Sequence, residues 1–502
     1  MKKLLTLLVR KHPLRFALAI VLGMIAGGFT AALIAAIHRG ATQPHDPTAK
    51  LLFAVAALAN VVAATVAYSN LLSLANEILA ELRVSLARSI LGASYGALEK
   101  MGSSVLLAAL TDDTQAIGGA ANAIVTTLIA GAACAGAFAY IATLSPLVCL
   151  AILLPVLIGA RVYRALAKRG QMVVGKAMAI RMRLMRSVSS SVSGAKELKL
   201  HAPRSAAFFS EALAPATREM HGTLHASYRM FTWAESIQLV LFFLVTGLVF
   251  FAWPRFVPGA EDKLPAVALA VLFLPASVSA LFMFVPVIIE GGEAVDRLEK
   301  LGLTLSGAAQ DSDASPTPRP WSKLELRGLS YKYRGDGDRE FMLGPLDLTI
   351  LPGELIFVTG GNGSGKTTFA KLLVGLYAPG EGTRTIDGRS SEGADELAAY
   401  RAYFSAVFVD CFVFDKIYGR EDANLDAKAN ALLAMLEIDK VVEVKGRALS
   451  TSNLSQGQRK RLALMFALLQ SRPIFVLDEW AAEQDPTYKK TFYETILPKL
   501  KA

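Results

Sequence analysis

The stretch GGNGSGKTT, residues 360–368, decides the fold of the C-terminal part of the chain. It fits the pattern G-x-x-x-x-G-K-[ST], and it lies between an apolar segment that predicts a strand and a segment that predicts a helix. Glycines let backbone N–H groups turn toward phosphate oxygens, and the helix N-terminus adds a favourable dipole. An ordinary glycine-rich turn is the alternative. The pattern and its flanking segments favour the phosphate-binding loop of a P-loop ATPase.

This loop predicts ATP and Mg²⁺ as ligands. The Lys366 ammonium is placed to neutralise the β- and γ-phosphates, and the Thr367 hydroxyl is placed to bind Mg²⁺. The loop residues that we expect at the nucleotide are Gly360, Asn362, Gly363, Ser364, Gly365, Lys366, Thr367 and Thr368.

A second acidic site follows the apolar residues 474–477, where IFVL runs into Asp478 and Glu479. An aspartate at the end of such a strand, downstream of a phosphate loop, is placed to hold Mg²⁺. Glu479 would point the other way and could orient or deprotonate the attacking water, which contributes about 10²- to 10⁴-fold in rate. The alternative for Glu479 is a solvated carboxylate at a strand end. We expect Lys366 and Glu479 to be the catalytic residues.

Strand and helix signals alternate from about residue 322 to the end of the sequence. This order predicts a parallel sheet with its ligand site beyond the carboxyl ends of the strands, hence an α/β P-loop ATPase domain over 322–502. The predicted strands are 323–333, 343–351, 353–360, 404–410 and 473–479; the predicted helices are 365–377, 394–403 and 456–470, with a small helical insert over 420–445.

The N-terminal part has long segments without charged residues. About 20 apolar residues cross a bilayer, whereas a buried core helix usually has about 10 to 14, so six spans are favoured over six core helices. The first apolar run is long enough to span and further spans follow it, which excludes a cleaved secretory signal. The sequence predicts an all-α transmembrane domain over 1–305 and a linker over 306–321, with spans at about 16–37, 51–76, 118–142, 146–165, 236–254 and 265–289.

Lysine and arginine predict the orientation of these spans. Basic residues crowd the N-terminal segment and the stretch 161–229, and cytosolic loops favour such residues. The N-terminus, the long loops and the ATPase domain are therefore expected in the cytosol. The net charge of +10 then reflects topology and contact with anionic membrane lipids, and we expect no nucleic acid as a partner. The three cysteines predict neither a disulfide framework nor a metal site.

The region from about 322 onward resembles the nucleotide-binding domain of an ABC transporter. NLSQGQRKR, 453–461, resembles that family's LSGGQ signature: Ser455, Gly457 and Gln458 match it, and Gln456 replaces a glycine. The resemblance implies that this segment caps the ATP of the opposite subunit, so the working form would be a homodimer. It also implies that Tyr333 stacks on adenine and that Asp485 lies in the loop connecting the two sites.

The six spans with long cytosolic extensions resemble the exporter type of this family, with membrane and ATPase regions on one chain. Residues 95–117 look like the first coupling segment, so we expect Asp112 and Asp113 near the ATPase surface. The stretch KELKLHAPRSAAFFSEAL looks like the second, with Phe208 and Phe209 as docking residues. For both segments, an ordinary amphipathic helix face is the alternative.

Several phrases resemble the cyclic-peptide exporter group of bacterial inner membranes. They are FSAVFVDCFVFD, KELKLHAPR and LDEWAAEQDP, the last with a tryptophan after the glutamate. That group transports peptide siderophores and lipopeptides, such as pyoverdine precursors and syringomycin. The resemblance implies ATP-driven export of a peptide-type substrate.

The sequence departs from the family pattern in two places. Val409 stands where exporters have a glutamine near Mg²⁺, and the adjacent Asp410 could replace it. All six histidines, at 12, 38, 45, 201, 221 and 225, precede the ATPase domain, so none can contact the γ-phosphate from a strand after Asp478. The final strands of the domain are also missing, and we expect a C-terminal tail that the present sequence does not include.

Three functions remain open at this point. The first is alternating-access export of a peptide-type substrate by a homodimer. The second is a lipid or lipid-linked flippase, whose cavity would look the same in sequence. The third is an ATP-gated regulator that hydrolyses weakly, as the missing glutamine and histidine would suggest. The charge-free windows argue against an intramembrane proton relay.

Overall fold

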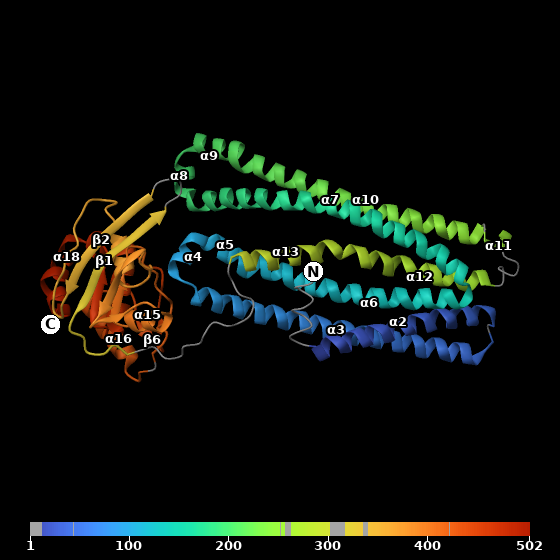
Figure 1. The fold of residues 1–502 in the computed structure, drawn as a ribbon, viewed down its shortest axis with the longest axis horizontal. Coiled ribbons are helices and arrows are strands. Elements are labelled where there is room, and N and C mark those ends of the chain that lie inside the picture. Colours follow the sequence, from blue (N-terminus) through green and yellow to red (C-terminus); the bar gives the residue numbers. More distant parts are fainter. Residues whose placement is uncertain are drawn as a thin grey trace. The chain divides into compact units, whose positions relative to one another are not determined.

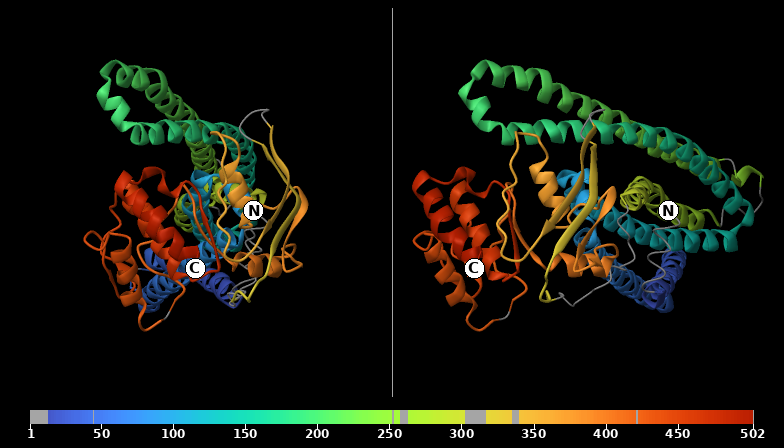
Figure 2. Two further views of the ribbon diagram at one scale, coloured as in Figure 1. Left: turned by 90° about the vertical axis from the view of Figure 1, so that its left-hand side faces the viewer. Right: turned by 60° about the vertical axis from the view of Figure 1, so that its left-hand side comes forward.

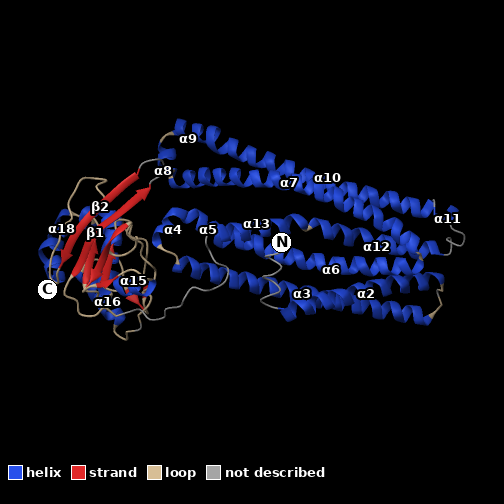
Figure 3. Ribbon diagram, in the orientation of Figure 1, coloured by secondary structure: helices blue, strands red, loops and turns tan. Residues whose placement is uncertain are grey.

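The computed structural model describes residues 13–43, 45–251, 253–256, 263–301, 317–334, 340–420 and 422–501. The chain forms two units. The helical unit comprises Met1–Leu91 and Ser103–Ala308, and the α/β unit comprises Gly92–Gly102 and Ala309–Ala502. All described strands lie in the α/β unit (Figure 3). The predicted fold class, a six-helix transmembrane domain with an α/β P-loop domain, is confirmed.

Long apolar helices build the helical unit (Figure 1). Six of the described helical segments are long and apolar enough to cross a membrane: Pro13–Thr42, Pro47–Gly92, Ser103–Leu144, Pro146–Leu166, Ala202–Phe251 and Leu264–Lys300. The elements are α2 (Pro13–Thr42), α3 (Pro47–Gly92), α5 (Ser103–Ala108), the π-helical turn η1 (Ala109–Asp113), α6 (Thr114–Leu144), α7 (Pro146–Ser193), α8 (Ala195–Leu200), α9 (Ala202–Phe208), the π-helical turn η2 (Phe209–Leu213), α10 (Ala214–Phe251), α11 (Trp253–Phe256), α12 (Leu264–Met283) and α13 (Val285–Lys300).

Helix α6 is central because it packs against α2, α12 and α13. Its contact with α2 requires glycine. A Cβ atom at Gly136 would lie 2.2 Å from the carbonyl oxygen of Gly27, and a Cβ at Gly27 would lie 2.4 Å from the carbonyl oxygen of Ala132. Small residues allow two membrane helices to approach closely, where van der Waals packing stabilises them.

Helices α7 and α10 pack along each other and form a long hairpin with α8 and α9 at its turn (Figure 2). Ser145 begins the hairpin by accepting a hydrogen bond from the backbone N–H of Val148, and Pro146 suits the first helical position. Between α7 and α10, the buried Tyr163 and Ala234 also contact Phe282 of α12.

The α/β unit combines small sheets with short helices. Its elements are α4 (Tyr95–Met101), β1 (Leu324–Arg334), β2 (Glu340–Ile350), α14 (Lys366–Leu373), β3 (Glu381–Ile386), β4 (Arg389–Ser390), α15 (Ala394–Arg401), β5 (Phe404–Val407), α16 (Leu425–Met435), β6 (Val444–Lys445), β7 (Ala448–Leu449), α17 (Gln456–Leu469), β8 (Ile474–Leu477), the 3₁₀ turn η4 (Trp480–Glu483), α18 (Pro486–Thr491), the π-helical turn η5 (Phe492–Ile496) and α19 (Leu497–Lys501).

The sheet prediction is correct only in part. Strands β5 and β8 are parallel, but the sheet β2-β1-β3-β4 is antiparallel. The predicted strand 353–360 is wrong, because these residues form no ladder with any described strand. Leu355, Ile356, Phe357 and Val358 are instead more than one-third exposed. An apolar run indicates burial, but it becomes a strand only where a neighbouring strand pairs with it.

These four residues line a groove of about 640 Å³ beside β8. Its other walls include residues 474–477 of β8 and the side chains of Phe492, Tyr493 and Leu497. The groove therefore extends along the strand that carries the acidic pair.

Helix α4 belongs to the α/β unit through one polar cluster. The Glu99 carboxylate accepts hydrogen bonds from Lys371 Nζ (3.2 Å) and from the Tyr377 hydroxyl, and Lys371 Nζ also bonds to the Tyr95 hydroxyl at 3.2 Å. Tyr377 stacks on Tyr331 with ring centroids 4.6 Å apart. Burial lowers the pKa of Lys371, but the hydrogen bonds with Tyr95 and Glu99 outweigh burial and raise that pKa overall. The cluster therefore holds a charged pair between α4 and α14.

We predict that Glu99→Ala releases α4. A hydrogen bond to a charged group contributes about 1.5–3 kcal/mol, and about 1.4 kcal/mol corresponds to tenfold in an equilibrium constant. Hydrogen exchange of the backbone amides over 95–101 should therefore become about 10- to 100-fold faster. Lys100→Ala, which removes an exposed neighbour on the same helix, is the matched control. Equal exchange in both variants would show that the cluster does not hold α4.

Candidate functional site

The loop that precedes α14 forms the centre of the candidate site. Gly363 and Gly365 have φ angles of 78° and 94°, which favour glycine. Space also excludes a side chain at Gly365, since a Cβ atom there would lie 2.9 Å from the ring of Phe341. Lys366 Nζ donates to the carbonyl oxygens of Gly360 and Gly361, both at 3.0 Å. The lysine is thus folded over its own loop.

An open cavity of about 570 Å³ lies over this loop. Glu479, although 113 residues from Lys366 in sequence (479 − 366), also faces the cavity, with Oε1 at 3.9 Å from Lys366 Nζ. The lining residues are Phe341, Asn362, Gly363, Ser364, Gly365, Lys366, Thr367, Thr368 and Glu479. The structure therefore brings Glu479 and the predicted loop residues except Gly360 together on one cavity.

Phe341 is a cavity residue that the sequence analysis missed. It is paired in register with Tyr333, the residue predicted to stack on adenine. The backbone of Tyr333 lies in β1, and its side chain lies outside the described residues. An aromatic residue opposite Tyr333 is the signal that could have found Phe341, but it required the antiparallel register of β1 and β2.

Asp478 and Glu479 occupy different surroundings. Asp478 follows β8, its backbone N–H donates to the carbonyl oxygen of Val407 at 2.8 Å, and only 6% of the residue is exposed. Its Oδ2 is buried and has no hydrogen-bond partner among the described residues. Mg²⁺ prefers oxygen ligands and is often held by one carboxylate, so Asp478 and the Thr367 hydroxyl at the cavity fit this ion.

Glu479 has a left-handed backbone, with φ 48° and ψ 32°. Such a conformation costs about 1–3 kcal/mol for a residue other than glycine and is enriched at functional sites. The side chain is 47% exposed. The alternative of a merely solvated carboxylate leaves this backbone conformation unexplained.

The predicted signature residues lie at the start of α17. Ser455 and Gln458 form a capping box: Ser455 Oγ accepts from the Gln458 backbone N–H, and Gln458 Oε1 accepts from the Ser455 backbone N–H at 3.0 Å. Ser455 and Gln456 are exposed, and Gly457 is half-buried. None of these residues lines the cavity over the loop of the same chain.

Asp485 is hydrogen-bonded to α17, the helix that begins at the signature residues. Its carboxylate accepts hydrogen bonds from the Tyr488 backbone N–H (2.9 Å) and from Arg461 (2.9 Å). These two bonds, the one from the backbone first, lower the pKa of Asp485. Gln484 bridges the same elements, because it accepts from Arg461 and donates to the carbonyl oxygen of Gly457 at 3.1 Å.

Asp410 lies three residues beyond β5 and is exposed. Because Val407 pairs with Leu477, Asp410 and Asp478 follow neighbouring strands at the same edge of the sheet. The replacement of the usual glutamine by Asp410 stays a prediction. Beside it, Phe412, Phe414 and Tyr418 expose an aromatic cluster, with neighbouring ring centroids 5.1 and 5.8 Å apart.

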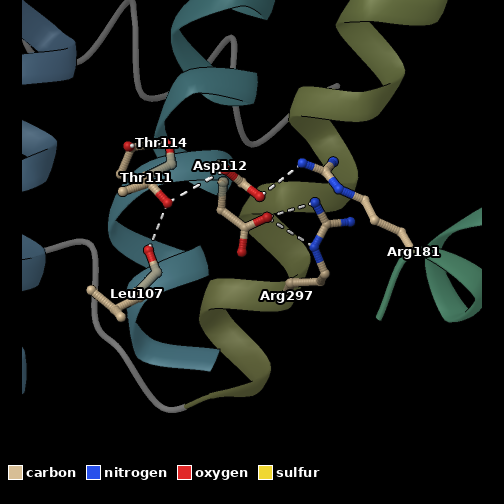
Figure 4. Close-up of polar contacts among 7 residues, drawn as sticks. Leu107, Thr111, Asp112, Thr114, Arg181 and Arg297 are labelled. Carbon is tan, nitrogen blue, oxygen red and sulfur yellow. Dashed lines mark hydrogen bonds and ion pairs between the residues drawn. The ribbon is translucent and has the colours of Figure 1, made fainter. Parts of the chain in front are cut away.

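Asp112 and Asp113 have ion-pair partners within the helical unit, and Figure 4 labels Asp112 and the two arginines, Arg181 and Arg297. Arg297 of α13 donates twice to Asp113 Oδ1, at 2.7 and 3.0 Å, and Arg181 of α7 donates to Asp112 at 2.9 Å. These bonds connect η1 with two other helices, so each aspartate has a structural role. Their proximity to the ATPase surface stays a prediction, as does docking by Phe208 and Phe209, of which Phe209 is 60% exposed.

Comparisons with known proteins agree with this geometry. A family model described as "ABC transporter" matches residues 343–482. The "ATP-binding protein SyrD" of Pseudomonas syringae pv. syringae is 31% identical over 517 residues, which cover 99% of this chain and 90% of that protein. The "ATP-dependent lipid A-core flippase" of Neisseria meningitidis is 32% identical over 189 residues, which cover 35% of this chain and 30% of that protein.

A solved structure entitled "Structure of a bacterial Atm1-family ABC exporter with ATP bound" shares the fold. It superposes with a TM-score of 0.75 at 18% identity and covers 98% of this chain and 90% of that chain. Three observations point to the same family: the loop 360–368, the six apolar helices, and similarity to a relative along nearly the whole chain. The chain belongs to the ABC transporter family, and its α/β unit is an ATPase that drives transport across a membrane.

Proposed function

We propose that the chain works as a homodimer in the bacterial inner membrane and exports a peptide-type substrate: a cyclic peptide, a peptide siderophore or a lipopeptide. The observation that carries the proposal is the cavity lined by Lys366, the glycine loop and Glu479, in a chain that also has six candidate spans. The similarity to SyrD over nearly the whole chain supports an activity that needs both units.

The residues at the cavity, together with Asp478 beside Glu479, have separate roles. Backbone N–H groups of the loop and Lys366 hold the phosphates of ATP, and Glu479 orients or deprotonates the attacking water. Thr367 and Asp478 would hold Mg²⁺, which when bound neutralises charge on the phosphates. The position at the end of β8 explains why Asp478 is buried, but it does not explain why its buried Oδ2 atom has no hydrogen-bond partner among the described residues. We therefore include Asp478 among the Mg²⁺ ligands.

A second copy completes each site in this proposal. Ser455 and Gln456 are exposed and do not line the cavity of their own chain, as expected of residues that cap the nucleotide of a partner. ATP would then favour the closed dimer because it contacts both copies only in that state. Closure would move the helical units, so substrate and ATP need not touch.

One face of α10 has the side chains that could bind an amphipathic substrate. Ala234 is buried against α7 on one side, and the opposite side carries a cavity of about 340 Å³. Tyr228 and Trp233 are 67% and 66% exposed there. The cavity is lined by His225, Tyr228, Arg229, Thr232, Trp233 and Ser236. Aromatic rings beside a cation bind molecules that have both apolar and acidic groups.

A lipid or lipid-linked flippase is the second candidate, favoured by the matches to lipid A-core flippases. Those matches cover about one-third of this chain, whereas the match to SyrD covers 99% of it.

The proposal predicts ATPase activity of the purified chain in liposomes that a lipopeptide or peptide siderophore stimulates. Glu479→Gln should lower the steady-state rate by about 10²-fold or more, the usual contribution of a general base. Stimulation by lipid A and not by peptides would favour the flippase. A wild-type rate no higher than that of Glu479→Gln would identify a weakly hydrolysing regulator instead.

The face of α10 predicts a separate effect on substrate affinity. Arg229→Gln and Trp233→Ala should each raise the peptide concentration for half-maximal stimulation about tenfold, because losing one charged hydrogen bond or one large apolar contact costs about 1.5–3 kcal/mol. Arg186→Gln, which removes an exposed charge from α7, is the control. Unchanged half-maximal concentrations in the two α10 variants would remove this face from the substrate path.

A further inference from the structure

Lys460 is a buried cation in the interior of the α/β unit. It lies in α17, one turn after Ser455, and only 1% of its side chain is exposed. Lysine is almost never fully buried unless its amino group is paired, because desolvation of a charge is costly. The contacts of this amino group therefore show what keeps it inside.

Two groups from the segment after β8 surround the Lys460 amino group. Nζ donates to the backbone carbonyl oxygen of Glu479 at 3.0 Å and lies 3.5 Å from Glu483 Oε2. A third bond runs in the opposite direction, from Trp480 Nε1 to the carbonyl oxygen of Lys460 at 2.8 Å. Helix α17 is thus joined to residues 479 and 480 by two hydrogen bonds.

The ion pair with Glu483 balances the charge of Lys460, but it does not hold residue 479 in place. The Glu483 side chain is 32% exposed, so water can solvate its carboxylate without a buried partner. The Glu479 carbonyl oxygen accepts from both Lys460 Nζ (3.0 Å) and the Ala482 backbone N–H (3.1 Å), so Lys460 adds a side-chain donor to a residue held at φ 48° and ψ 32°. Trp480 supports the same turn, because its buried ring packs against the ring of Phe492, with the ring centroids 4.3 Å apart.

We propose that Lys460 is a positioning residue for Glu479. By fixing the Glu479 carbonyl group, it stabilises the left-handed turn that directs the carboxylate to the cavity and to within 3.9 Å of Lys366 Nζ. The proposal rests on the proposed role of Glu479 as the general base. Because Lys460 belongs to the helix that begins with Ser455, it also connects the surface that caps a partner's nucleotide with the base of its own site.

The first test compares Lys460→Met with Lys460→Arg. Methionine fills similar space but has no hydrogen-bond donor. We expect kcat for ATP hydrolysis to fall about tenfold or more, because part of a general-base effect of about 10²–10⁴ is lost. The KM for ATP should change less than about threefold. Arginine keeps a donor and should restore at least part of kcat. Lys440→Gln removes a charge from an exposed position of the α/β unit outside the signature segment and the cavity, and should behave as the wild type.

A double variant separates positioning from charge pairing. Lys460→Met/Glu483→Gln removes both members of the ion pair and should stay as slow as Lys460→Met. In a Glu479→Gln background, Lys460→Met should lower the residual rate by less than about twofold, because residues that act as a unit are not additive. A structural role alone would instead lower this residual rate as well.

Recovery of the wild-type rate in the double variant, or a wild-type kcat in Lys460→Met, would overturn the inference. If Glu479→Gln itself keeps the wild-type rate, the proposed function fails first. A slow Glu479→Gln enzyme together with a fast Lys460→Met enzyme would leave the proposed function standing and remove only the role of Lys460.

Discussion

The parallel pairing of β5 with β8 is the constraint on which the candidate site depends. The ladder ends with Val407 opposite Leu477, and the next hydrogen bond, from the Asp478 backbone N–H to Val407, fixes where the acidic pair begins. Beyond that point, Asp478 is buried and Glu479 turns toward the phosphate loop. A shift of one residue in this pairing would exchange the two carboxylates, because successive strand residues point to opposite faces.

Two polar clusters join helices that are separate in sequence. In the α/β unit, Glu99 holds α4 to α14 through Lys371 and Tyr377. In the helical unit, Asp113 and Asp112 hold η1 to α13 and α7. Helix α4 is separated from α3 only by Ala93 and Ser94, so the proposed cycle has a short covalent connection from the ATPase to a candidate span.

Local chemistry made much of the architecture predictable from sequence. The glycine loop before a helix and the long charge-free segments each depend on neighbouring residues alone, and both features are present in the structure. The strand predicted over 353–360 was wrong because pairing depends on distant partners. The antiparallel β1–β3 pair was missed for the same reason.

The site was predictable to a similar degree. Lys366 and Glu479 could be named because each follows a recognisable strand or loop signal. Phe341 could not, because its place at the cavity depends on the register between β1 and β2. Lys460 lies in the predicted helix 456–470, and only the structure shows its amino group inside, donating to the Glu479 carbonyl oxygen. Long-range contacts of this kind leave no periodic signal in the sequence.

The central claim is that two copies of the chain enclose ATP between the loop of one and the signature segment of the other. Intermolecular disulfide formation tests it most directly. Two differently tagged chains, both carrying Glu479→Gln and lacking the native cysteines, would be coexpressed, one with Asn362→Cys and the other with Gln456→Cys. The account predicts that Mg²⁺ and ATP together strongly increase the yield of the crosslinked pair. No crosslink with ATP, or an equal yield without nucleotide, would contradict it.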